Sequence, residues 1–93
     1  MKMSEIGVRI NAHLNRFEAD PVINALHEVR GSRLSPYWHA GAAQSGRFVY
    51  VTYVSYQGQT HLTKEQAEKY LAWLDAGNVG RHYEALRAIS TTN

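Results

Sequence analysis

The chain has 93 residues, of which 44% are hydrophobic and 19% charged, and these values indicate one small globular domain over residues 1–93. It contains no cysteine, which excludes disulfides, thiolate catalysis and cysteine-ligated metal centres. The ten basic and eight acidic residues are spread evenly along the chain and give a net charge of +2, so no segment has the basic character of a nucleic-acid-binding tail. No apolar run is long enough for a membrane helix or a signal peptide, so we expect a cytoplasmic protein that does not bind membranes.

Two helices are predicted in the N-terminal third. Apolar residues recur every three or four positions over residues 4–18, which predicts an amphipathic helix there. Asp20 followed by Pro21 is a typical helix start, and the apolar spacing beyond it predicts a second, shorter helix that ends at Gly31.

A three-stranded meander is predicted in the middle of the chain. Residues 47–56 form an unbroken run of β-branched and aromatic residues, which predicts a long central strand. Residues 37–43 and 59–62 are placed to pair with it through short hairpins.

Both faces of this central strand are largely apolar, so one face should meet something besides the core. We expect four of its side chains to face the core: Phe48, Val49, Val51 and Val54. Tyr50 and Tyr56 fit the core and an exposed face equally well, because the sequence does not show whether helices cover one side of the sheet or both.

Two further helices are predicted at the C-terminal end. The pair Thr63 and Gln66 forms a capping box, in which each side chain bonds to the backbone of the other residue, and Gly77 ends the helix that follows. Asn78 is expected to cap a last helix that runs to Ile89. The predicted fold is therefore α+β, a three-stranded antiparallel meander with two N-terminal and two C-terminal helices in the order ααβββαα.

No residue pattern points to catalysis. The five histidines offer no pair at metal-ligand spacing, and no serine lies in a nucleophile motif. The acidic residues fall on predicted helices, where they are typical of solvated faces and caps. We therefore expect a protein without enzymatic activity, metal or cofactor.

The middle of the chain has the composition of a protein–protein interface. From Leu34 to Thr63 the only Lys, Arg, Asp or Glu is Arg47, whereas six of the ten aromatic residues lie there. Interface centres are depleted in charge and enriched in Tyr, Trp and Arg. The predicted partner-binding residues are Tyr37, Trp38, Arg47, Tyr50 and Tyr56.

Nucleic-acid binding is the alternative. Arg9, His13 and Arg16 form one stripe of the first predicted helix. Between the last two helices, Gly77 to Gly80 spell G-x-x-G before Arg81, a layout with which K homology domains clamp a nucleic-acid backbone. The alternative contact residues are therefore Arg9, His13, Arg16, Gly80 and Arg81.

The C-terminal third resembles small phage anti-CRISPR proteins that inhibit the type I-F surveillance complex. The resemblance covers less than a third of the chain, and the positions that carry it are Glu65, Gln66, Glu68, Tyr70, Leu71, Leu74, Gly80, Arg81, Ala85 and Ile89. It implies a small antiparallel sheet against two C-terminal helices and a non-enzymatic protein that binds Cas backbone subunits, so that target DNA cannot hybridise. The N-terminal part departs from that family, because helices are predicted here where the family has mainly sheet.

The leading hypothesis is therefore a phage or mobile-element protein that acts in the cytoplasm of a bacterial host and inhibits a host protein assembly. The CRISPR–Cas effector is the partner that the resemblance implies. A structural or assembly subunit of a phage particle, forming homodimers or larger oligomers through an exposed sheet edge, is a third hypothesis.

Overall fold

The computed structural model describes residues 1–19, 38–53, 58–78 and 82–91. Within these ranges the fold is α+β, as predicted, and its elements are α1 (Met3–Ala19), β1 (His39–Ala42), β2 (Val49–Tyr53), β3 (Gly58–Leu62), α3 (Lys64–Asp75) and α4 (His82–Ser90). The strands form the predicted antiparallel meander in the order β1-β2-β3. Three of the four expected helices lie in the described ranges, and the helix expected from Asp20 to Gly31 lies outside them.

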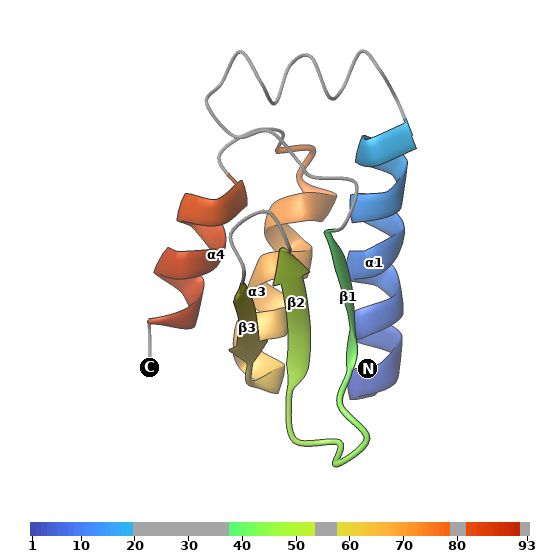
Figure 1. Ribbon diagram of the computed structural model, residues 1–93, viewed down its shortest axis with the longest axis vertical. Helices are drawn as coiled ribbons and strands as arrows, with labels where there is room; N and C mark the ends of the chain where they lie inside the picture. The colour runs from blue at the N-terminus through green and yellow to red at the C-terminus, as the bar shows by residue number, and fades with distance from the viewer. Residues whose placement is uncertain (20–37, 54–57, 79–81, 92–93) are drawn as a thin grey trace.

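The described helices surround the sheet on three sides. α3 lies behind the sheet, α1 runs alongside β1 at one edge, and α4 lies beside β3 at the opposite edge (Figure 1). The front face of the sheet in this view is covered by none of these helices. Of the two arrangements that the sequence leaves open, the described elements therefore match the one in which helices cover only one face of the sheet, with α1 and α4 along its edges.

One hydrophobic core fills the space between the sheet and the helices. Every described helix and strand contributes to it, so segments far apart in the chain are buried together. Its buried members are Ile6, Ile10, Leu14, Trp38, Ala40, Val49, Val51, Leu62, Ala67, Tyr70, Leu71, Leu74 and Leu86. The predicted helix over residues 4–18 and the core positions Val49 and Val51 are thus confirmed, while Val54 lies outside the described residues.

The central strand is shorter than predicted in the part that the structure describes. Arg47 and Phe48 lie before β2, which begins at Val49, and residues 54–57 are outside the described ranges. The β1–β2 connection is closed by hydrogen bonds from the Ala43 N–H to the Phe48 carbonyl oxygen, 3.0 Å, and from the Gly46 N–H to the Ala43 carbonyl oxygen, 2.9 Å. Gly46 has a φ of 72°, which glycine adopts without strain.

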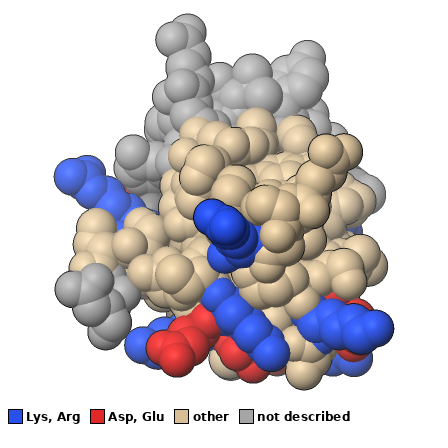
Figure 2. Space-filling model, turned by 90° about the horizontal axis from the view of Figure 1, so that it is seen from below, with Lys and Arg blue, Asp and Glu red and all other residues tan. Residues whose placement is uncertain are grey.

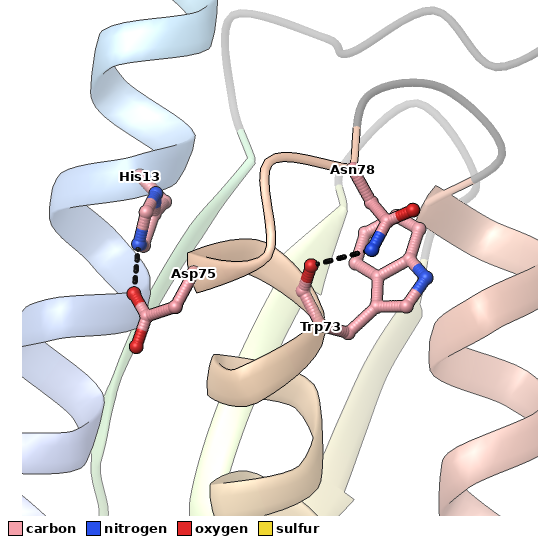
Figure 3. A network of polar contacts seen from close by, with 4 residues as sticks. All are labelled: His13, Trp73, Asp75 and Asn78. Atoms are coloured by element: carbon pink, nitrogen blue, oxygen red, sulfur yellow. Dashed lines mark hydrogen bonds and ion pairs between the residues drawn. The ribbon is translucent and has the colours of Figure 1, made fainter.

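The ends of α3 are set by local chemistry. Both bonds of the capping box between Thr63 and Gln66 are present at its start, and Gly77, with a φ of 84°, follows its end. The expectation that Asn78 caps the last helix stays a prediction, because residues 79–81, between Asn78 and the described part of α4, lie outside the described residues. Asn78 donates a 2.8 Å hydrogen bond from Nδ2 to the carbonyl oxygen of Trp73, so it satisfies a carbonyl of the last turn of α3 (Figure 3).

A cluster of aromatic rings joins α3 to α4. His82 is fully buried, and its ring lies edge-on to Trp73 at 4.9 Å and to Trp38 at 6.3 Å between centroids. The Tyr70 hydroxyl lies 3.4 Å from Nδ1 of His82, and burial raises the pKa of Tyr70 well above its ordinary value. Tyr70 therefore stays neutral, and this cluster has the character of a packed interior.

Of the helices in the described ranges, none combines the length and apolarity needed to cross a bilayer.

Candidate functional site

The candidate site is the face of the sheet that α1, α3 and α4 leave uncovered. Along β2, Val49 and Val51 are fully buried, whereas Tyr50 between them is only partly buried. Because side chains alternate along a strand, Tyr50 and its cross-strand partners Gly41 and His61 lie on the face opposite the core. We call this surface the open face; its members are His39, Gly41, Phe48, Tyr50, Thr52, Gln59 and His61.

A chain of polar contacts orders the β3 side of the open face. Nε2 of His61 lies 2.9 Å from Oε1 of Gln59, and Nε2 of Gln59 donates to Oγ1 of Thr52 at 3.1 Å. Since the amide oxygen of Gln59 can only accept, Nε2 of His61 carries the proton. The His61 ring also stacks on Phe48, with centroids 4.1 Å apart and planes inclined by 21°. These contacts therefore hold the side chains on this part of the open face in place.

Gly41 makes room for the Tyr50 ring on the β1 side of the open face. A Cβ on Gly41 would lie 2.8 Å from the Tyr50 hydroxyl oxygen and 3.0 Å from the ring carbon that bears it. An aromatic ring that covers a cross-strand glycine shields the strand backbone in its place. His39 meets the same ring edge-on, with centroids 6.1 Å apart. Tyr50 is thus held across β1, and it is partly buried.

The open face carries no Lys, Arg, Asp or Glu among its described members. Arg47, which is exposed in the turn before β2, is the nearest cation along the chain. Seen from below, acidic and basic side chains lie intermixed along one rim of the molecule, and further Lys or Arg side chains stand among uncharged residues above it (Figure 2). The arrangement offers aromatic rings with polar atoms, which suits docking more than acid–base chemistry.

The structure separates the predicted partner-binding residues. Tyr50 lies on the open face and Arg47 is exposed in the turn before β2, whereas Tyr37 and Tyr56 lie outside the described residues. The prediction that Trp38 lies on a partner-binding surface is wrong. The residue is only 2% exposed and belongs to the core, where it packs against His82. The tryptophan precedes β1, so the aromatic composition of this segment did not show whether the ring faces inward or outward.

The prediction that Phe48 faces the core is also wrong. It was expected in the core, but it is half-buried on the open face and stacks on His61. Phe48 lies two residues before Tyr50, and side chains two residues apart in an extended chain point to the same face of the sheet, so its ring lies on the outer side. Sequence reasoning also missed His39, Gln59 and His61, whose only signal was their alternation with the buried positions of β1 and β3.

The alternative nucleic-acid residues are partly brought together. Arg9, His13 and Arg16 line one shallow pocket, as their helical spacing predicts, together with Asp75 from the end of α3. Gly80 and Arg81 lie outside the described residues. In the ranges that the structure describes, no three His, Asp or Glu side chains come together as a metal-ligand set.

Comparisons with protein-family models, with curated proteins and with solved structures find no match to this chain.

Proposed function

We propose that this protein is a binding module that docks on a protein partner through the open face. The observation that supports the proposal is an ordered aromatic and amide surface, left uncovered by α1, α3 and α4 and free of charged side chains among its described members. Rings that are already held in place lose little conformational freedom on binding.

The composition of the open face favours a protein over a nucleic acid. Nucleic acids are attracted mainly by clustered Lys and Arg, and none of the described members of the open face is a Lys or Arg. Tyr50, Gln59 and His61 instead combine apolar area with polar atoms, as residues at the centre of protein interfaces do. A partner surface with few charges, rich in backbone amides and apolar side chains, complements them.

The most specific form of the proposal is inhibition of a host assembly by a phage or mobile-element protein. It rests on the resemblance of the C-terminal third to type I-F anti-CRISPR proteins. In that form, the open face covers a Cas backbone subunit and prevents the target DNA from hybridising. The chain itself needs no catalytic group for this, because occupancy of the subunit is sufficient.

A single charge placed on the open face tests the docking surface. Gln59→Lys adds one positive charge at an exposed position, and it should weaken partner capture by about tenfold, because an unpaired charge would be buried in the contact. Glu68→Gln changes the net charge by the same amount on the exposed side of α3 and is the matched control. Equal capture by the two variants would exclude the open face as the docking surface.

The measurement uses two sources of partner. Immobilised wild-type and variant chains are incubated with a bacterial lysate, and the retained proteins are identified and quantified by mass spectrometry. Purified type I-F surveillance complex is tested separately, with target-DNA binding as the readout. Selective capture from the lysate without an effect on that complex would keep the docking surface and exclude the Cas partner.

A further inference from the structure

A second surface, on the α3 side of α1, carries charged side chains, whereas the described members of the open face carry none. A pocket of about 260 Å³ is lined there by Arg9, Ala12, His13, Arg16 and Asp75. We call it the arginine pocket. Its members come from α1 and from the last residue of α3, so the packing of these two helices forms it.

A short contact between α1 and α3 fixes one side of the arginine pocket. Nε2 of His13 lies 2.7 Å from Oδ1 of Asp75 (Figure 3). The side chain of His13 is 18% exposed and that of Asp75 56% exposed. Because a carboxylate accepts, Nε2 of His13 carries a proton, and the imidazole ring is held in place from the α3 side. Asp75 is thereby engaged with His13.

The balance of charge in the arginine pocket is positive. Among the described residues that line it, Arg9 and Arg16 carry two permanent positive charges and Asp75 carries one negative charge. The position of Arg16 in the last turn of α1 is explained by the negative end of the helix dipole. Arg9 lies about two turns earlier, where the dipole does not account for it.

We propose that the arginine pocket binds a phosphoryl group, either of a small phosphate or of a nucleic-acid backbone. Guanidinium groups bind phosphate oxygens through paired, charge-assisted hydrogen bonds. Arg9 and Arg16 flank His13 on one face of α1, so a phosphoryl group in the pocket can be contacted from both sides. This site is separate from the open face and does not depend on a protein partner.

The histidine ring signals in an NMR titration test the proposal on the wild-type chain. Inorganic phosphate, and separately an oligodeoxythymidylate, is added at low salt while the ring C–H signals of His13 and His61 are followed. Binding in the arginine pocket shifts the His13 signals in a saturable manner and leaves His61, on the open face, unchanged. Saturation by inorganic phosphate assigns a small phosphate ligand, and saturation by the oligonucleotide alone assigns a nucleic-acid backbone.

Charge variants test the same site independently. Arg9→Gln and Arg16→Gln should each weaken binding of the active probe by about tenfold, the effect of one charge-assisted hydrogen bond. Arg87→Gln removes the same charge from the exposed surface of α4 and should change binding by less than about twofold. If a glutamine variant fails to fold, Arg9→Lys and Arg16→Lys keep the charge but lose the paired geometry and should weaken binding to a smaller extent.

Two results would overturn the proposal. The first is the absence of a saturable His13 shift with either probe. The second is an equal loss of affinity in Arg87→Gln and in the pocket variants, which would indicate attraction by net charge alone.

Discussion

Gly7 determines how closely α1 approaches the sheet. A Cβ at this position would lie 2.9 Å from the backbone nitrogen of Ala42 and 2.9 Å from the carbonyl carbon of Gly41. Both atoms belong to the backbone of β1 and cannot rotate away as a side chain can. The close approach also lets Oδ1 of Asn11 accept a 2.9 Å hydrogen bond from the Ala40 N–H, which satisfies a donor on the outer edge of β1.

Gly7→Ala should therefore lower the free energy of unfolding by about 1–2 kcal/mol. The displacement of α1 outweighs the gain of about 1 kcal/mol that Ala has over Gly inside a helix. Ala12→Gly, on the exposed side of the same helix, measures helix propensity alone and should cost about 1 kcal/mol. Urea unfolding of the two variants provides the measurement, and a stabilised Gly7→Ala protein would contradict the tight contact.

Among the elements, those bounded by a specific chemical signal could be predicted from the sequence. Thr63 and Gln66 have side chains that bond to the helix start, and Gly77 has the conformational freedom that a helix end requires. The buried face of α3 also follows from spacing, because Ala67, Tyr70, Leu71 and Leu74 recur at helical intervals. These signals are local, so a single sequence contains them.

The sidedness of the sheet and the contacts between distant segments could not be predicted. Both alternating sets of the central run are largely apolar, so the sequence alone did not show that Phe48 faces outward. Trp38 is buried by its contacts with α4, which lies far along the chain. Asp75 reaches His13 across 62 residues, and no spacing rule connects two such positions. Tertiary packing therefore decided what the local pattern left open.

The capping box gives a test at the scale of one element. Thr63→Ala should cost about 1 kcal/mol, because the Gln66 N–H loses the hydroxyl that accepts its 3.2 Å hydrogen bond. Thr63→Ser retains the hydroxyl and should stay within about 0.5 kcal/mol of the wild type. Thermal unfolding followed by circular dichroism measures both, and equal stability of the alanine and serine variants would show that the Thr63 hydroxyl contributes nothing.

At the scale of the whole molecule, α1 and the C-terminal helices share one core, so we expect them to fold as one unit. Ile10 from α1, Val51 from β2 and Leu74 from α3 are all buried in the same cluster. α1 is far from α3 and α4 in sequence, so its contacts close a long loop and form only when the whole chain is folded. With no disulfide to hold its parts together, the domain depends on this shared packing.

Ile10→Ala tests whether the chain unfolds as a single cooperative unit. The residue is fully buried, and its truncation should lower the free energy of unfolding by about 2–5 kcal/mol. The two tryptophans, Trp38 and Trp73, lie outside α1, so their fluorescence reports on other parts of the fold. In Ile10→Ala the urea midpoints from fluorescence and from circular dichroism should decrease together. The control is Val8→Ala, at a position 68% exposed on the same helix, which should change the free energy of unfolding measured by either signal by less than about 0.5 kcal/mol. A fluorescence midpoint that stays at the wild-type value while the helical signal is lost earlier would mean that α1 is a separate folding unit, and the single shared core would then be wrong.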